Sequence, residues 1–321
     1  MINTYKYDGA IHSASYVTPE MYGAKGDGTT NDTTAIQNAV NNQGLIVFDS
    51  TKNYVITDAV RLKRNTVLDL NGATLTFPTT GGLRIFVNFL TTDTNFTAYN
   101  GNGNITIKNG TIIGGNISFA HGGNILLENI KFKNGLSPHF LEICACKNYV
   151  IRHCSFEGVS DNNISVYEYI NIDPATYYAF PLLPNGSAFF DGAKNDGIIL
   201  EDCYFALGNG SFAYGYNALG VHGVSGQSVK HKNIYLKNNI LLGFTGCGFR
   251  INDMENVYIG GNDIRVVGDG IMVGDVGNVD NLVVFDNFVT SSSGQKIVLT
   301  SNRYTNVTVV GNKTSGTIEP F

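Results

Sequence analysis

Four short polar segments in the middle of the chain carry side chains suited to chemistry on a sugar. They are YEYINID (167–173), FFDGAKND (189–196), GVHGVSG (220–226) and GFRIND (248–253). Hydrolysis of a glycosidic bond with inversion needs one carboxyl group as acid and one as base, roughly 6.5–9.5 Å apart. We predict that Asp173 and Asp191 form this pair and that Glu168 is a third catalytic carboxyl group.

Other polar side chains in and near these segments are suited to assisting the reaction or binding the substrate. A histidine beside carboxyl groups adjusts their protonation, and an arginine holds an anionic group through two hydrogen bonds. We predict the first role for His222 and the second for Arg250. The remaining predicted polar binding residues are Asn171, Lys194 and His139, the last within SPHFLEICACKN (137–148).

Aromatic residues are concentrated in the same region. Between residues 167 and 216 lie 12 of the chain's 36 aromatic side chains. Because sugar rings stack their C–H faces on aromatic rings, this concentration suits a carbohydrate cleft, and we predict that Tyr167 and Tyr177 bind substrate. The alternative is that the rings pack long loops onto the protein or form a subunit interface.

A repeat along the chain must position these residues. In five segments an Asn precedes an alternating apolar strand, and an Asn or Cys follows six residues later: KNYVIRHCSF (147–156), KNIYLKNNIL (232–241), ENVYIGGNDI (255–264), DNLVVFDNFV (280–289) and TNVTVVGNKT (305–314). A sixth copy, NDGIILEDCYF (195–205), has Gly197 in place of the first Asn. We call the Asn or Cys six residues after the first Asn of each copy, or after Gly197 in the sixth copy, the anchor. The anchors are Cys154, Cys203, Asn239, Asn262, Asn287 and Asn312.

The spacing of the anchors indicates the architecture. Successive anchors are 49, 36, 23, 25 and 25 residues apart, which we interpret as two units, one unit with an insertion, and three plain units. Stacked units bury apolar faces that a single unit cannot, with equivalent residues about 4.8 Å apart. The sequence therefore predicts an all-β fold, a single-stranded parallel β-helix in which the anchor Asn side chains form a hydrogen-bonded ladder.

The repeat also predicts a stripe of candidate residues. Asp191 and Arg250 each precede an anchor by 12 residues, so we expect them in one column, two coils and about 10 Å apart. Asp173 is expected one coil before Asp191, and His222 between Asp191 and Arg250. The alternative for Asp173 and Asp191 is a turn-forming role, because an Asp beside Pro or Gly is common in turns.

Composition excludes several classes of protein. The formal net charge of −5 argues against a nucleic-acid partner, and no apolar run is long enough for membrane insertion. The N-terminus lacks the apolar core of a signal peptide. Five cysteines without a CxxC pair indicate neither a disulfide framework nor a zinc site, so we expect no metal and no cofactor.

Only one segment has a helical pattern. NDTTAIQNAVNN (31–42) offers Asn31 or Asp32 as a helix cap and an apolar stripe, and we expect a short helix that covers the N-terminal end of the β-helix. We divide the chain into an N-terminal extension (1–18) and a β-helix domain (19–321) with inserted loops between 155 and 232.

The run TPEMYGAKGDGTTNDTTAIQNAV (18–40) resembles the opening signature of the pectate lyase-like and polygalacturonase-like right-handed β-helix superfamily, in the version of phage tail spikes and appendages. The order Asn-Ile-Asp, Asp, His-Gly and Arg-Ile-Asn is similar to the hydrolase pattern Asn-x-Asp, Asp-Asp, Gly-His-Gly and Arg-x-Lys. The resemblance implies Asp173 and Asp191 as acid and base, His222 as their modulator and Arg250 as the substrate clamp. Three positions depart from the pattern, namely Val221, Gly192 and Asn252.

These observations lead to one expected function and two alternatives. We expect a tail-spike-like depolymerase, a glycoside hydrolase acting on a bacterial surface glycan or teichoic acid. The alternatives are a non-catalytic carbohydrate-binding receptor-recognition protein and a polysaccharide lyase on the same fold. The resemblance also implies a homotrimer in a virion tail or outside the cell.

Overall fold

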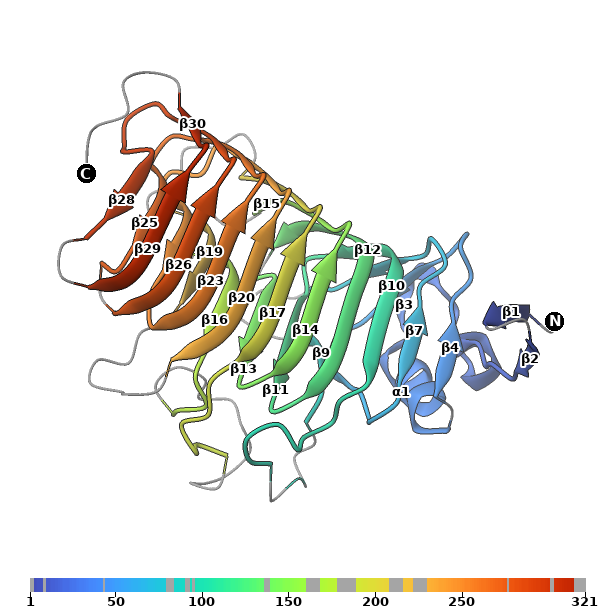
Figure 1. Cartoon of the computed structure of the whole chain (residues 1–321). Coiled ribbons are helices and arrows are strands. Elements are labelled where there is room, and N and C mark those ends of the chain that lie inside the picture. Colours follow the sequence, from blue (N-terminus) through green and yellow to red (C-terminus); the bar gives the residue numbers. More distant parts are fainter. Residues whose placement is uncertain are drawn as a thin grey trace.

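Short alternating strands, separated by corners rich in Asn and Gly, wind the chain into a stack of similar coils (Figure 1). This computed structural model describes residues 3–7, 10–42, 44–78, 84–89, 93, 96–135, 139–159, 168–177, 189–207, 216–221, 230–275, 277–300 and 303–314. Strands of successive coils pair in parallel and largely in register. The prediction of an all-β parallel β-helix is therefore confirmed.

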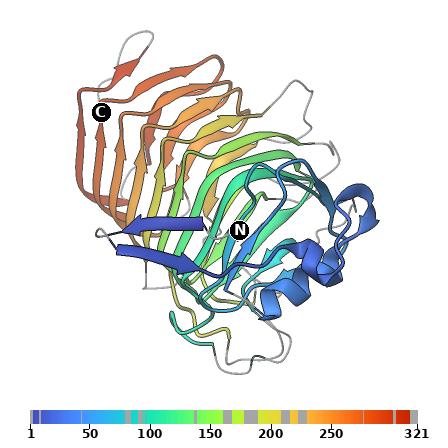
Figure 2. The ribbon, with the colours of Figure 1, turned by 90° about the vertical axis from the view of Figure 1, so that its right-hand side faces the viewer.

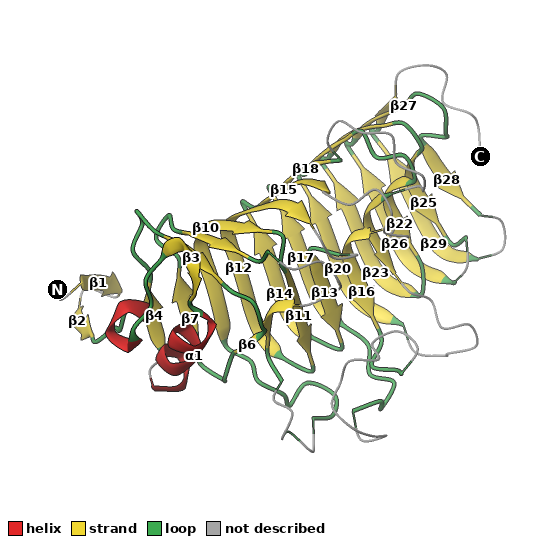
Figure 3. Cartoon of the chain, turned by 180° about the vertical axis from the view of Figure 1, so that it is seen from behind, coloured by secondary structure: helices red, strands yellow, loops and turns green. Residues whose placement is uncertain are grey.

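The coils build three walls, seen from behind in Figure 3. The first wall contains β4 (Leu45–Val47), β7 (Val67–Asp69), β10 (Ile105–Ile113), β12 (Gly123–Gly135), β14 (Lys147–Arg152), β17 (Asp196–Glu201), β20 (His231–Lys237), β23 (Met254–Gly260), β26 (Val279–Phe285) and β29 (Tyr304–Val310). The second contains β3 (Asp27–Asn31), β5 (Asn53–Val55), β8 (Thr74–Thr76), β15 (Ser155–Val159), β18 (Tyr204–Ala206), β21 (Ile240–Leu242), β24 (Asp263–Val266), β27 (Phe288–Ser291) and β30 (Lys313–Thr314). β10 and β12 are long enough to pair in both walls.

The third wall is a separate sheet and carries four of the candidate residues, Glu168, Asn171, Asp173 and Arg250. It contains β6 (Val60–Arg61), β9 (Arg84–Val87), β11 (Asn116–Ala120), β13 (Leu141–Cys144), β16 (Glu168–Asp173), β19 (Asn217–Val221), β22 (Cys247–Ile251), β25 (Asp269–Val273) and β28 (Ile297–Leu299). Alternate residues of its strands point into the apolar core, and the others point outward.

The N-terminal end of the stack is covered, as Figure 2 shows. A hairpin of β1 (Asn3–Tyr7) and β2 (Ala10–Ala14) precedes a 3-10 helix (Pro19–Tyr22) and helix α1 (Thr33–Asn42). Helix α1 buries Ile36, Ala39 and Val40 against the first core residues, as its apolar stripe predicts. Asp32 accepts hydrogen bonds from the Lys25 and Gly26 amides and so fixes the loop before the helix.

The predicted ladder of anchor residues runs along the corner between the first and second walls. The Asn262 backbone N–H donates to Asn287 Oδ1 at 3.0 Å, and the side-chain amide of Asn262 donates to the same atom at 2.8 Å. The same pattern joins Asn239 to Asn262 and Asn287 to Asn312. Each anchor thus gives buried backbone N–H groups at the corner a partner, as buried amides require.

The first Asn of the repeat has a different role, because it adopts the left-handed backbone conformation. Its φ lies between 50° and 57° at Asn148, Asn233, Asn256, Asn281 and Asn306. Gly197, the exception in the sequence template, has a φ of 79° in the same column. Asn and Gly are the residues that tolerate this conformation, which explains why Gly substitutes for Asn here.

One interpretation of the spacing is wrong. The 49 residues between Cys154 and Cys203 are not two units, because β14 pairs directly with β17, and β15 with β18. This segment is a single coil that carries about two dozen extra residues. These extra residues therefore belong to the coil that contains β16 in the third wall.

Replacing an anchor side chain should weaken the stack. Asn262→Ala removes the acceptor for the Asn239 amide and the donor to Leu236 O. Leaving buried groups without partners costs about 1–3 kcal/mol, so we expect urea unfolding to report a loss in this range. The same exchange at Asn38, exposed on helix α1, is the control and should change stability by less than about 0.5 kcal/mol. Equal effects at both positions would contradict the role of the ladder.

Candidate functional site

The outward face of the third wall carries a row of polar side chains that are buried. The pairing of β13, β16 and β19 aligns Glu142 with Asn171 and with Gly220. Leu219 pairs with Phe249, so the row continues to Arg250 in β22. Buried polar groups on an outward face are costly unless they are hydrogen-bonded or paired, so each of them needs a partner.

Glu142 begins the row and is held by groups from earlier coils. Arg84 Nη2 lies 2.7 Å from Glu142 Oε2, and the hydroxyl of Ser118 donates to the same oxygen. Burial opposes ionisation of Glu142, but the charges of Arg84 and His139 and the hydrogen bonds outweigh it, so the pKa of Glu142 is lowered. Glu142 is therefore a structural anion.

Asp173 and Glu168 lie at opposite ends of β16. Asp173 is 0% exposed, and its Oδ2 accepts a hydrogen bond of 2.8 Å from Asn171 Nδ2. Glu168 is 2% exposed, and its side chain folds over Gly220, where an added Cβ would lie 2.1 Å from Glu168 Cγ. Glycine at 220 is what allows the Glu168 carboxyl group to reach the neighbouring coil.

His139 and Asn217 hold Glu168 in this position. His139 Nδ1 lies 2.7 Å from the Glu168 carbonyl oxygen and 3.8 Å from its carboxylate. Asn217 Nδ2 donates to Glu168 Oε1 at 3.4 Å, while Asn217 Oδ1 accepts from the Cys247 amide. Of the predicted residues, Glu168, Asn171 and Asp173 thus lie on one strand, β16, and His139 contacts Glu168 from the segment before β13.

Lys194 lies beside this group, where the third wall meets the first. It is 3% exposed, and burial lowers its pKa, although the negative charges of Asp253 and Asp173 act in the opposite direction. The carbonyl oxygen of Lys194 accepts a hydrogen bond from Tyr99. The ammonium group of Lys194 thus lies within electrostatic range of the carboxyl groups of Asp253 and Asp173.

Asn195 and His231 stack at the same corner. The Asn195 side chain accepts from the Cys146 amide and donates to the carbonyl oxygens of Ile143 and Asp173. The Asn195 backbone N–H donates to His231 Nδ1 at 3.1 Å, so the proton of the neutral ring is on Nε2. Burial, with a smaller effect from the charge of Lys194, lowers the pKa of His231 to about 3.

Arg250 is engaged by another side chain of the protein. Its Nη2 and Nε lie 2.6 and 2.9 Å from Asp275 Oδ2, and Asn252 Nδ2 donates to Asp275 Oδ1 at 2.6 Å. The guanidinium group that we predicted to hold an anionic sugar is thus already paired with a carboxylate. Asn252, which departs from the family pattern, completes this contact.

Asp191 lies apart from the row, and the prediction that it shares a column with Arg250 is wrong. It is an exposed residue outside the strands, and the residues that precede Arg250 in its column are Gly220 and Asn171. Asp191 Oδ1 accepts from the Ala193 amide and Oδ2 from the Ala98 amide. Asp191 thus forms the turn that an Asp-Gly pair favours and ties two connecting segments together.

Next to Asp191, the rings of Tyr177 and Phe190 pack against each other. Tyr177 is 62% exposed, and Phe190 supports it edge-on, with ring centroids 5.7 Å apart. Phe189, next to Phe190, is buried in a small cluster outside the third wall. His121 bridges the segments beneath: its Nδ1 lies 2.8 Å from Ala98 O and its Nε2 2.9 Å from Phe189 O.

Two of the predicted site residues lie outside the part of the chain that the structure describes, and several residues of the observed network were not predicted. His222 and Tyr167 lie outside the described residues. Arg84, Ser118, Glu142 and Asp275 were missed, because their partners lie on other coils. Aligning NISFA (116–120), FLEIC (140–144) and YINID (169–173) as strands of one wall reveals the polar column of Ser118, Glu142 and Asn171.

The described residues contain no group of three His, Cys, Asp or Glu side chains that could hold a metal ion. Among the same residues, no helix is long and apolar enough to cross a membrane.

The buried histidine should make stability depend on pH. Because the folded pKa of about 3 lies below the ordinary value of about 6.5, the unfolded chain binds the proton more tightly. The free energy of unfolding therefore falls as the pH drops below about 6.5. His231→Asn keeps an acceptor for the Asn195 amide, and we expect its loss of stability between pH 7 and 4.5 to be smaller by on the order of 2 kcal/mol. Urea unfolding at both pH values measures this, and parallel losses in the two proteins would contradict it.

The bridging histidine should contribute more stability than an exposed histidine of the same backbone conformation. His121 and His153 have φ values of 54° and 53°, which Asn also tolerates. His121→Asn leaves two carbonyl oxygens without their ring partner, and we expect it to cost about 1–3 kcal/mol in urea unfolding. His153→Asn, the control, should cost less than about 0.5 kcal/mol. Equal stability of His121→Asn and the control would contradict a stabilising role for the His121 bridge.

Comparison with known proteins gives one relative in sequence and several in structure. No protein-family model matches the chain. It is 28% identical over 291 residues to the plasmin and fibronectin-binding protein A of Streptococcus pneumoniae, a match that covers 78% of this chain and 39% of that protein. The chain thus spans well under half the length of this relative.

Two solved structures are similar over almost the whole chain. The crystal structure of PfbA, a surface adhesin of Streptococcus pneumoniae, has a TM-score of 0.77 at 21% identity and covers 95% of this chain and 81% of that one. The structure of a double mutant of the tailspike protein of E. coli bacteriophage HK620, in complex with a pentasaccharide, has a TM-score of 0.66 at 14% identity and covers 98% of this chain and 61% of that one. The chain therefore has the right-handed parallel β-helix fold that the opening signature implied, which it shares with a bacterial adhesin and with phage tailspikes.

Proposed function

We propose that the chain is a carbohydrate-binding protein of the adhesin type, which recognises a surface glycan without cleaving it. One observation carries this proposal: two of the three carboxyl groups predicted for catalysis, those of Asp173 and Glu168, are buried in a bonded network, whereas the side chain of Tyr177, four residues after Asp173, is exposed. This preference reverses the order of the two functions expected from the sequence.

The exposed groups have the chemistry of sugar binding. Tyr177 presents its ring to solvent, and Phe190 fixes it from below, so little side-chain freedom is lost when a sugar stacks on it. Asp191 is exposed nearby in sequence and can accept hydrogen bonds from sugar hydroxyl groups. His121 and Asp191 hold the segment of Phe190 and Asp191 against Ala98, and backbone hydrogen bonds from Ala175 to residues 192–193 join it to the segment of Tyr177, which pre-organises the surface.

The similar proteins support the same choice. The sequence relative is named for binding plasmin and fibronectin, and the tailspike structure contains a pentasaccharide. We therefore propose a location at a bacterial or viral surface. A polysaccharide or teichoic acid remains the proposed partner, and the expected homotrimer stays a prediction.

Hydrolysis is the second candidate, and one feature favours it. The Glu168 carboxyl group lies over Gly220, which pairs with Asn171, two residues before Asp173. With strands about 4.8 Å apart and a rise of about 3.3 Å per residue, the backbone positions of Gly220 and Asp173 are about 8 Å apart. This spacing lies within the roughly 6.5–9.5 Å that separates the two carboxyl groups of inverting glycosidases.

Binding is tested with a panel of bacterial surface glycans and teichoic acids, using an immobilised-glycan assay. We expect Tyr177→Ala to weaken binding about tenfold, because truncating a central aromatic contact removes more than about 1 kcal/mol. Tyr258→Ala is the matched control: Tyr258 is 38% exposed on the first wall, and its loss should leave binding unchanged. Equal binding by the two variants would refute the proposed surface.

Hydrolysis is tested on the same panel by measuring new reducing ends. We expect none from the wild-type chain. Reducing ends that are lost in Asp173→Asn and Glu168→Gln, but kept in Asp191→Asn, would instead establish the second candidate. A rise in absorbance near 235 nm together with reducing ends would indicate a lyase.

A further inference from the structure

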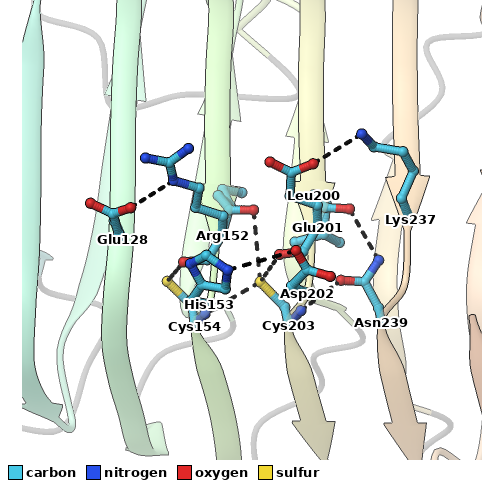
Figure 4. Close-up of polar contacts among 11 residues, drawn as sticks. Glu128, Arg152, His153, Cys154, Leu200, Glu201, Asp202, Cys203, Lys237 and Asn239 are labelled. Atoms are coloured by element: carbon cyan, nitrogen blue, oxygen red, sulfur yellow. Dashed lines mark hydrogen bonds and ion pairs between the residues drawn. The ribbon is translucent and has the colours of Figure 1, made fainter.

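Two cysteines occupy adjacent positions in the anchor column. Cys154 and Cys203 are each 2% exposed and stand where later coils have Asn (Figure 4). The Cys154 backbone N–H donates to Cys203 Sγ at 3.4 Å, in the same way that the Cys203 N–H donates to Asn239 Oδ1 at 3.1 Å. The Cys203 side chain thus points along the stack at the coil of Cys154.

The backbone geometry brings these two residues within range of a covalent bond. The strands that flank them pair in register, Arg152 with Glu201 and Ser155 with Tyr204. Equivalent Cα atoms on neighbouring coils are about 4.8 Å apart. Disulfides join Cα atoms that are roughly 4.4–6.8 Å apart. The backbone spacing of this pair therefore falls inside the range for a disulfide.

The other three cysteines do not offer such a pair. Cys144 is packed in the small cluster outside the third wall, whereas Cys146 faces the main core, so the wall lies between the two side chains. Cys247 begins β22 in the third wall, where its register partner in the next coil is Asp269. Among the five cysteines, Cys154 and Cys203 are the two that adjacent coils place side by side.

We propose that Cys154 and Cys203 form a disulfide bond when the chain folds in an oxidising environment. The reaction is exchange with a small-molecule disulfide such as oxidised glutathione. The two thiols lose two protons and two electrons and form one S–S bond, while the small disulfide gains them and becomes two thiols. This inference does not depend on the proposed function.

The bond would form before the coil is completed. Once folded, burial and the contact with Cys154 hold the pKa of the Cys203 thiol above its usual range, so the reactive thiolate is scarce. Each thiol instead donates to carbonyl oxygens, Cys154 to Arg152 O at 3.3 Å and Cys203 to Glu201 O at 3.2 Å. Exchange is therefore expected during folding, while both thiols are open to solvent.

The proposed disulfide would act on the coil between Cys154 and Cys203, which carries about two dozen extra residues. Residues 154–203 contain β16, Tyr177 and Asp191, and the 49-residue spacing is the longest in the repeat. A disulfide between the ends of this segment would close it into a ring, which restricts the unfolded chain more than a cross-link across a plain coil. The disulfide would therefore stabilise the coil that has the longest insertion.

The test is refolding of the full chain from urea, once with a mixture of oxidised and reduced glutathione and once with excess reductant. Free thiols are then counted in denaturant, and digested protein is analysed by mass spectrometry. We expect three free thiols instead of five after oxidative refolding, and a linked peptide pair containing Cys154 and Cys203. Five thiols in a correctly refolded chain, or a linkage to another cysteine, would overturn the proposal.

Two variants separate the bond from general effects on folding. Cys203→Asn restores the side chain that later coils use, so it should fold and retain all four of its thiols under oxidising conditions. Cys144→Ala should still lose two thiols. We expect the oxidised wild-type chain to unfold a few degrees above the reduced chain, and this difference to vanish in Cys203→Asn. A difference that persists in Cys203→Asn would also count against the proposal.

Discussion

Register between coils is the constraint on which the rest of the structure depends. Strands of successive coils must begin at equivalent residues, because a shift of one residue would turn every side chain of a strand to the other face of the sheet. Every coil must therefore turn its corners at the same place. Columns of left-handed Asn and Gly make this possible, and the anchor ladder gives buried amides at one corner their partners.

The same constraint creates the candidate site. In-register stacking places Glu142 beside Asn171 of the next coil, and the Glu168 side chain lies over Gly220 of the coil after that. Buried charges are tolerated only with partners, and Arg84 and Asp275 supply partners from distant parts of the sequence. The network that results is well suited to holding the wall together. Recognition is then left to the exposed side chains on the inserted segments.

The structural features that can be predicted from the sequence are those that arise from the repeat. The β-helix, the ladder and the special place of Gly197 all follow from residues that recur at a fixed spacing. Asp191 lies outside the repeat, so counting residues from an anchor placed it wrongly. The 49-residue spacing has the same cause, because an insertion and an extra unit look alike until strand pairing is known. The Arg84–Glu142 contact spans 58 residues and has no local pattern.

The structure holds the acidic groups of β16 in the protein interior, whereas Asp191 is exposed to solvent. Chemical labelling of carboxyl groups with a carbodiimide and an amine, read out by mass spectrometry on the folded chain, tests this directly. We expect rapid labelling of Asp191 and protection of Asp173 and Glu168 until the protein is unfolded. Labelling of Asp173 and Glu168 as fast as Asp191 would contradict it, and would favour an open catalytic cleft.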